Sequence, residues 1–507
     1  MVVLDGSPLT IDDVIAVARE GATVEVGEEA RRRMAPSRAV VEQLDSSDSI
    51  AYGVTTGFGA LADRAVQPAD RAALQRHVVL SHASGMGDPL DAEVVRGMLL
   101  LRARTLCAGY SGVRPLLPES LVALLNSGLV PWVPEHGSLG ASGDLAPLAH
   151  ATACLLGEGW VWDGTRRQAA GEALAARGLE PITVGPREGL ALINGTDGMS
   201  ALLALAVADL DALLRAADVI AAMSVEALLG TTRAFAENAV ALRPAPGQAA
   251  SAANLRALLA DSALVASHRE SHHAVQDPYS LRCTPQVHGA ARDVHAFARE
   301  CVQRELEAVV DNPMVLDGEV VSGGNFHGQA LAYAADMLAS VCADVAAISE
   351  RRLDRLLDPA RSRGLPAFLT PNPGLNSGLM ICQYTAAAMV VELRAAASPI
   401  AVHSMSTSAG QEDHVSMGFT AATRTRRSVA TLRRVLAAEL VAAAQALELR
   451  APLRPGPATG AVIASLRERV AHLDDDRVLA GDLEQAGEWL REQRWGGVHP
   501  GVTDSLR

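Results

Sequence analysis

Aromatic residues are scarce in this 507-residue chain, where they make up 3% of the sequence against 49% for all hydrophobic residues. Alanine and leucine supply most of the apolar surface. Strands favour β-branched and aromatic side chains, so interlocking helices must bury most of this surface. A chain of this length can enclose a large core. The composition therefore predicts a mainly α-helical protein.

Cys-x-x-Cys pairs and long basic runs are also absent. The six cysteines are scattered, which favours reduced thiols over disulfides. The formal net charge is −14, whereas a nucleic-acid binder needs clustered lysine and arginine to displace counterions. The composition therefore argues against a disulfide-stapled fold and against a nucleic-acid partner.

The sequence lacks the uncharged apolar stretch of roughly 18 residues that a membrane-spanning helix needs. The apolar run ALLALAVADLDALLRAADVIAAM is interrupted by Asp209 and Asp211. The first residues, MVVLDGSPLT, place an acidic residue where a secretory leader carries positive charge. We therefore expect a soluble, cytoplasmic protein with no membrane partner.

Helical and loop-rich segments alternate along the chain without an internal repeat. Thr10 precedes IDDVIAVARE, which predicts a capped amphipathic helix. The stretch 51–62 is rich in glycine and threonine and is typical of a loop. We expect a small, mixed and loop-rich N-terminal domain over 1–200, a long-helix bundle over 201–450 and a helical tail over 451–507.

Small residues crowd around Ser142 in the stretch EHGSLGASGDLAPLAH. Asp144 is a plausible N-cap for the helix that follows, and a helix start presents unpaired N–H groups and partial positive charge. A tight turn here would let the Gly143 nitrogen approach the Ala141 carbonyl carbon. Cyclisation with loss of water, including the Ser142 hydroxyl, would give a conjugated methylidene-imidazolone. Taken alone, however, Ala-Ser-Gly favours an ordinary turn before a helix.

Long motifs follow one another in the order of a known family: YGVTTGFG, LSHASGMG, GSLGASGDLAPLAH, GLALINGTDG, VQDPYSLRCTPQ, DNP, GNFHG, RLDRLLD, GLPAFL and QEDHVSMG. From about Tyr52 to about Leu453 the chain resembles the aromatic amino acid ammonia-lyase family, most closely its members that act on histidine. The resemblance implies a mainly α fold with a long central helical bundle of the ammonia-lyase/fumarase-like type. It also implies a homotetramer whose active sites are shared between subunits.

The same resemblance implies that Ala141, Ser142 and Gly143 cyclise autocatalytically to 4-methylidene-imidazol-5-one (MIO), with no external cofactor. Such an electrophile meets a physical need, because an α-ammonium is a poor leaving group. Two further residues match positions beside the prosthetic group: Asn194, whose side-chain amide can hold an oxyanion or a substrate carboxylate, and Phe326. Asp144 matches a residue near the cyclising serine that acts in maturation. From the residues alone, Asn194 also suits a turn and Phe326 suits core packing.

A β-carbon proton is weakly acidic, so the elimination also needs a base. By resemblance Tyr279 is that base, Arg282 pairs with the substrate carboxylate, and Gln276 lines the same site. Residues three apart share a helical face or meet in a turn. A tyrosine titrates near pH ~10, so it would need nearby positive charge to act as a base. Tyr52 resembles a mobile-loop tyrosine that closes the site and shares in proton transfer.

Substrate choice depends on His82 and Glu412, which match residues placed around the imidazole in members that act on histidine. An imidazole offers a donor and an acceptor to such partners, whereas a phenyl ring would leave the carboxylate desolvated and unpaired. This favours L-histidine as substrate and trans-urocanate as product. The alternative on the same scaffold is a tyrosine or phenylalanine ammonia-lyase, or an aminomutase.

Two other motifs point to different classes of protein. Gly57-Phe58-Gly59 with Ala62 weakly matches a dinucleotide fingerprint, but no βαβ pattern adjoins it. His268 and His272 have a spacing that could bind a metal, as in a hydrolase, but no third ligand is evident, and we expect no metal. A catalytically dead helical scaffold is opposed by the presence of Ser142, Tyr279 and Arg282.

Overall fold

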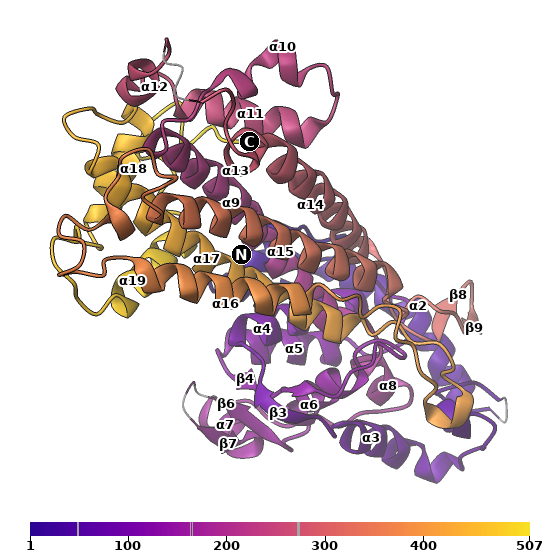
Figure 1. Cartoon of the computed structure of the whole chain (residues 1–507). Coiled ribbons are helices and arrows are strands. Elements are labelled where there is room, and N and C mark those ends of the chain that lie inside the picture. The colour runs from indigo at the N-terminus through magenta and orange to yellow at the C-terminus, as the bar shows by residue number, and fades with distance from the viewer. Residues whose placement is uncertain (48–49, 163, 165, 271–273) are drawn as a thin grey trace. The chain divides into compact units, whose positions relative to one another are not determined.

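Helices dominate the chain in the computed structural model, which describes residues 1–47, 50–162, 164, 166–270 and 274–507 (Figure 1). Strands are short, with between two and four residues each in the described part of the chain. The prediction of a mainly α-helical protein is therefore confirmed.

The chain forms two compact units, and the first contains residues 1–206, 298–336 and 399–426. Its short helices and strands are β1 (Val2–Leu4), α1 (Ile11–Ala18), β2 (Val24–Val26), α2 (Glu28–Asp45), α3 (Arg71–His82), β3 (Met86–Pro89), α4 (Ala92–Cys107), α5 (Leu116–Asn126), β4 (Val130–Pro131), β5 (Pro134–His136), α6 (Leu145–Leu155), β6 (Trp160–Trp162), β7 (Arg167–Ala169), α7 (Ala170–Ala176), α8 (Glu188–Ile193), β8 (Met314–Leu316) and β9 (Glu319–Val321). Strands β1 and β2 pair in parallel, whereas the β3–β5, β4–β6–β7 and β8–β9 pairings are antiparallel.

The second unit contains residues 207–297, 337–398 and 427–507. Its own helices are α10 (Glu237–Val240), α11 (Pro246–Leu258), α12 (Ala263–Ser267), α13 (Tyr279–Arg282), α16 (Met380–Ala396), α18 (Pro457–Arg467) and α19 (Ala480–Arg491). Four of the five boundaries between the units fall inside the long helices α9 (Asp197–Ala227), α14 (Thr284–Glu307), α15 (Gln329–Leu357) and α17 (Gly418–Glu448), and the fifth follows α16. The three-part division over 1–200, 201–450 and 451–507 remains a prediction.

Helix α1 begins as its sequence predicts. The Thr10 hydroxyl accepts a hydrogen bond from the Asp13 backbone N–H at 3.1 Å, and the Asp13 carboxylate accepts one from the Thr10 backbone N–H at 2.8 Å. This reciprocal capping box satisfies two of the N–H groups that a helix start leaves without partners.

Buried ion pairs join the long helices within the second unit. Glu439 on α17 accepts hydrogen bonds from Arg352 on α15 at 2.5 and 2.9 Å and from the Ser224 hydroxyl on α9 at 2.7 Å. Asp218 on α9 accepts one from Arg292 on α14 at 2.6 Å. Because a buried charge is costly without partners, these contacts select one arrangement of the α9, α14, α15 and α17 segments within this unit.

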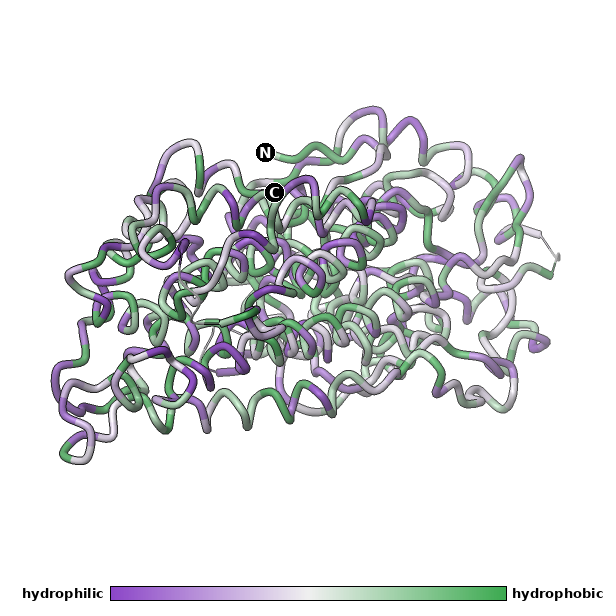
Figure 2. The backbone as a smooth tube through the Cα atoms, turned by 45° about the horizontal axis from the view of Figure 1, so that its top comes forward, coloured by the Kyte–Doolittle hydropathy of each residue, from purple (hydrophilic) through white to green (hydrophobic). Residues whose placement is uncertain are grey.

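Hydrophobic and hydrophilic residues alternate along the helices, as expected for helices that bury one face (Figure 2). By length and hydropathy alone, α15 could cross a membrane, but 67% of its most apolar 18-residue window is buried within the structure. Two charged residues, Asp336 and Asp344, also interrupt the apolar sequence of that helix. These properties are typical of a core helix.

All six cysteines are free, in agreement with the predicted thiols. Burial raises the pKa of Cys107, Cys154, Cys342 and Cys382 to about 12. These four thiols therefore stay protonated near neutral pH and act as small apolar side chains.

Candidate functional site

The Ala141-Ser142-Gly143 segment forms a compact turn in the first unit. Ser142 has φ +54°, between Gly140 at +70° and Gly143 at +74°. A positive φ is uncommon for a serine and costs free energy that the surrounding structure must offset. A Cβ atom on residue 143 would lie 2.2 Å from the Gly195 carbonyl oxygen, so only glycine fits there. Cyclisation of this segment requires such a turn.

Asp144 occupies the N-cap position of α6, as predicted, but its side chain makes no cap hydrogen bond to that helix. Its carboxylate instead accepts hydrogen bonds from the Ser138 hydroxyl at 2.9 Å and from the Met199 backbone N–H at 2.8 Å. Met199 lies in the first turn of α9, so Asp144 caps that more distant helix. The fold brings the α9 N–H groups within reach, and they compete successfully for the carboxylate.

Asp144 is fully buried, and burial raises its pKa to about 7 against the lowering effect of its hydrogen bonds from Met199 and Ser138. The folded protein therefore holds this proton more tightly than the unfolded chain does. The stability that this preference contributes is complete below pH ~4 and is lost as the pH rises through ~7.

We expect Asp144→Asn to change how stability depends on pH. Asparagine stays neutral, so from pH 4.5 to 8 the unfolding free energy of the variant should rise relative to that of the parent by about 3 kcal/mol, at about 1.4 kcal/mol for each unit of pKa shift. Denaturant unfolding at several pH values measures this gain. The control is the same substitution at exposed Asp63, and equal pH profiles for parent and Asp144→Asn would contradict the expectation.

Asn194 lies directly against the triad turn and is fully buried. Its Oδ1 accepts a hydrogen bond from the Ser142 hydroxyl at 2.8 Å, and its Nδ2 donates to the Asn312 carbonyl at 2.6 Å. The hydrogen bonds assign the amide orientation, with the oxygen facing Ser142. The structure therefore brings together two predicted site residues that are 52 positions apart.

The segment that carries Glu412 also contacts the triad turn. The Met417 backbone N–H donates to the Leu139 carbonyl at 2.8 Å, and the Ser416 hydroxyl donates to the Gly140 carbonyl at 3.4 Å. The Glu412 carboxylate accepts a hydrogen bond from Thr407 at 2.8 Å.

His82, at the end of α3, is partly buried and lies within electrostatic reach of Glu412. Burial lowers the pKa of His82, while its contact with the Val78 backbone and the charge of Glu412 raise it. Of the two residues predicted to choose the substrate ring, Glu412 thus acts by its charge on His82 within the first unit. Burial favours the neutral imidazole, which can donate and accept hydrogen bonds.

Tyr52 and Phe326 lie on loops of the same unit, and both are partly buried. The Tyr52 ring meets Phe58 edge to face at 6.3 Å, and its hydroxyl accepts a hydrogen bond from the Gly59 backbone N–H at 3.2 Å. Next to Phe326, the His327 ring stacks on His414 with centroids 5.8 Å apart. This stacking connects the Phe326 loop to the Glu412 segment.

The remaining predicted residues lie in the second unit, on or before α13. Tyr279 is 70% exposed, and the Arg282 guanidinium lies 4.5 Å from the centre of its ring. The predicted proximity of these two residues is confirmed, and it places positive charge over the phenol. Gln276, three residues before Tyr279, is exposed.

Asp277 anchors this segment and has no role in the sequence prediction. Its carboxylate accepts hydrogen bonds from Arg363 at 2.9 Å and from the Thr231 backbone N–H at 2.7 Å, and its carbonyl accepts one from Arg282 at 2.8 Å. The motif QDPYSLR contains both Asp277 and Arg282, but Arg363 and Thr231 lie 86 and 46 residues away from Asp277. Only the fold therefore reveals that Asp277, which binds Arg282, is itself anchored by distant partners.

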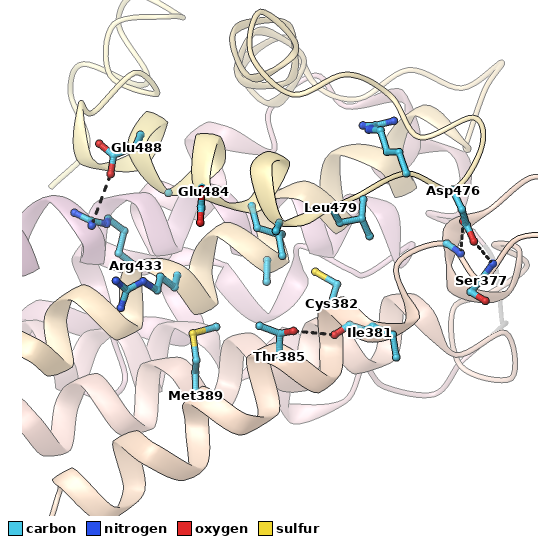
Figure 3. Close-up of a pocket in the computed structure, with 17 residues that line it drawn as sticks. Ser377, Ile381, Cys382, Thr385, Met389, Arg433, Asp476, Leu479, Glu484 and Glu488 are labelled. Atoms are coloured by element: carbon cyan, nitrogen blue, oxygen red, sulfur yellow. Dashed lines mark hydrogen bonds and ion pairs between the residues drawn. The ribbon is translucent and has the colours of Figure 1, made fainter.

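A cavity of about 860 Å³ lies elsewhere in the second unit, among α16, α17 and α19. Figure 3 shows Cys382 and Met389 on one side of it and Glu484 on another, with Arg433 near Glu488. The predicted site residues do not line this cavity.

Of the candidate metal pair His268 and His272, the second lies outside the described residues. His268 Nε2 lies 3.0 Å from the Gly230 carbonyl oxygen, so this ring has a protein partner. Among the described residues, no three His, Cys, Asp or Glu side chains are grouped to hold a metal ion.

Comparison with known proteins gives consistent matches over the whole chain. Residues 9–468 match the family model described as aromatic amino acid lyase. The chain is 51% identical over 510 aligned residues to the histidine ammonia-lyase of Streptomyces coelicolor, covering 100% of this chain and 99% of that one.

Solved structures agree with this match. The histidine ammonia-lyase of Trypanosoma cruzi has a TM-score of 0.89 at 40% identity, with 98% of this chain and 97% of that one covered. The tyrosine aminomutase of Streptomyces globisporus has a TM-score of 0.93 at 37% identity, with both chains fully covered. The helical fold and the triad turn therefore occur in a chain similar to enzymes that act on amino acids.

Proposed function

Because the chain belongs to the aromatic amino acid lyase family, we propose that it catalyses the non-oxidative elimination of ammonia from L-histidine to give trans-urocanate. The observation that carries this proposal is the 51% identity, over the full length of both chains, to a histidine ammonia-lyase. The proximity of His82 and Glu412 supports the choice of histidine, because both side chains can hydrogen-bond an imidazole.

We infer that Ala141, Ser142 and Gly143 form MIO, the prosthetic group of the reaction. A bond forms between the Gly143 nitrogen and the Ala141 carbonyl carbon, and two water molecules leave, one of them with the Ser142 hydroxyl oxygen. Three observations fit this chemistry: the positive φ of Ser142, the lack of room for a Cβ atom at Gly143, and the hydrogen bond that the Ser142 hydroxyl donates to Asn194. Once formed, MIO supplies an electrophile that promotes departure of the substrate nitrogen.

The chain's own residues then bind the substrate and move its proton. Arg282 pairs with the carboxylate through its planar guanidinium, and Tyr279 accepts the β-proton at its phenolic oxygen. The electrons of the Cβ–H bond become the new double bond as the Cα–N bond breaks, so no oxidant is needed. Gln276 lines the site, and Tyr52 closes it from its loop.

We further propose a cytoplasmic homotetramer whose active sites combine residues of neighbouring subunits. Large apolar side chains are exposed on α15 and α16, as expected for faces that another copy covers: Tyr333, Met337, Ile381, Tyr384 and Val391. The 70% exposure of Tyr279 suits a residue that serves a site completed by another subunit. L-Histidine is the small-molecule partner, with neither nucleic acid nor membrane expected.

The substrate proposal predicts a clear preference among amino acids. We expect purified protein mixed with L-histidine to produce the near-ultraviolet absorbance of urocanate. The kcat/KM for L-phenylalanine should be lower by up to roughly 100-fold, since a phenyl ring leaves polar groups of the site without a hydrogen-bond partner, at a cost of about 1–3 kcal/mol. Equal or better turnover of phenylalanine or tyrosine would overturn the assignment of histidine.

An aminomutase is the second candidate, because the tyrosine aminomutase structure has the higher TM-score of the two solved structures. An aminomutase returns ammonia to the β-carbon, so it yields a β-amino acid. Chromatography of the products distinguishes the outcomes: free ammonia with an unsaturated acid supports the lyase, and a β-amino acid supports the aminomutase.

A further inference from the structure

A buried ion pair lies behind Asn194 in the first unit. Arg187 Nη2 donates to Asp311 Oδ1 at 2.6 Å and to the Pro313 carbonyl at 2.7 Å. Both side chains are buried, with exposures of 2% and 0%. Arg187 immediately precedes α8 with φ +72°, a backbone conformation that is costly for arginine. The surrounding contacts hold this arginine in place despite that cost.

The Arg187–Asp311 pair lies around the Asn312 carbonyl, which accepts a hydrogen bond from the Asn194 side chain. Arg187 binds residues on both sides of Asn312, and the Asn312 backbone N–H donates to Asp311 Oδ1 at 2.7 Å. The Asn312 carbonyl in turn accepts from Asn194 Nδ2 at 2.6 Å. The ion pair therefore controls where this carbonyl points.

Asp311 also acts on the Asn194 amide by its charge. Its Oδ1 lies 3.4 Å from Asn194 Nδ2, whereas its Oδ2 is buried with no hydrogen-bond partner among the described residues. The contacts of this carboxylate thus converge on the oxygen that faces Asn194. A negative charge there attracts the amide donor and repels the amide oxygen, which favours the orientation with Oδ1 toward Ser142.

We propose that Arg187 and Asp311 are positioning residues that hold the Asn194 amide with its oxygen toward Ser142. This inference rests on the proposed function, because it assigns the pair to the triad turn. In the alternative orientation, the Asn194 amide nitrogen would face the Ser142 hydroxyl and would present a donor instead of an acceptor. Loss of the pair should therefore slow maturation and lower kcat, with a smaller effect on KM.

The first test is a double-mutant cycle between Arg187→Lys and Asn194→Ala. Lysine keeps the charge but cannot reproduce the fork that binds Asp311 and the Pro313 carbonyl. We expect Arg187→Lys to lower kcat by roughly tenfold in the parent, and by less than about twofold when Asn194 is already alanine. Intact mass should show the loss of two water molecules delayed in the single Arg187 variant. Additive effects would overturn the proposal.

The second test measures orientation without using activity. Asn194→Asp places a second carboxylate against Asp311, so the melting temperature should fall. Asp311→Asn removes the like charge and supplies an amide donor but also weakens the pair with Arg187, so the double variant should lose clearly less melting temperature than the sum of the two single losses. If the two substitutions lower the melting temperature additively, Asp311 does not face the Asn194 amide donor and the inference is wrong.

A matched control separates positioning from general stability. Arg292→Lys weakens another buried arginine–aspartate pair, with Asp218 at 2.6 Å in the second unit, and should lower the melting temperature with kcat unchanged. The tests also distinguish this inference from the proposed function. A parent chain that shows neither urocanate release nor loss of two waters refutes the proposed function, and the melting temperatures still decide whether Asp311 orients Asn194.

Discussion

Ser142→Ala is expected to lower turnover of L-histidine by at least about 10⁴-fold, because it removes the residue from which the electrophile forms. Alanine lacks the hydroxyl whose loss creates the conjugated methylidene. Single-turnover and steady-state assays of urocanate absorbance measure the effect. The parent chain should be lighter than its encoded mass by two water molecules, and the variant should not show this full loss.

A control for Ser142→Ala is the same substitution at Ser120 on α5, whose hydroxyl donates to the Leu116 carbonyl of its own helix at 2.7 Å. That variant should keep the loss of two waters and full turnover. If Ser142→Ala retained substantial activity, the prosthetic group would not form from Ser142. If the parent kept its full encoded mass while active, the reaction would not use a group derived from this triad.

Tyr279→Phe should lower kcat by roughly 10²–10⁴-fold, the usual effect of losing a positioned general base. Phenylalanine preserves the ring that Arg282 covers at 4.5 Å, so the segment should remain folded. The KM should change little, since Arg282 still binds the substrate carboxylate. Steady-state kinetics with L-histidine test this, with Tyr110→Phe as a control at another exposed tyrosine.

Mixing the two inactive variants tests whether active sites are shared. If one subunit supplies Ser142 and another supplies Tyr279, co-expression of Ser142→Ala with Tyr279→Phe should restore part of the activity, because some mixed sites contain both intact residues. Unchanged inactivity of mixed oligomers, with mixing verified by tagged copies, would mean that both residues of a site come from one chain. Each variant expressed alone is the matched control.

Several features of this protein were predictable because they depend on neighbouring residues. The α1 capping box needs only Thr10 and Asp13, three positions apart. The contact between Tyr279 and Arg282 likewise follows from helical spacing. The helical class follows from an alanine- and leucine-rich composition. The family motifs supplied the candidate site residues.

Other features depend on partners that no local rule can identify. Asp144 looks like a helix cap in the sequence, yet its carboxylate binds Ser138 and the start of α9, 55 residues away. The anchoring of Asp277 by Arg363 spans 86 residues.

By itself, the sequence determined the helical class, the family and the candidate chemical groups, because composition, spacing and motifs are local properties of the chain. The tertiary structure decided which way these groups face. Arg187 and Asp311 are 124 residues apart, and Asn194 is 117 residues from Asp311. A buried polar group must find a hydrogen-bond partner, and the fold alone decides which distant groups come within reach. The orientation of the Asn194 amide toward Ser142 is therefore a property of the folded chain.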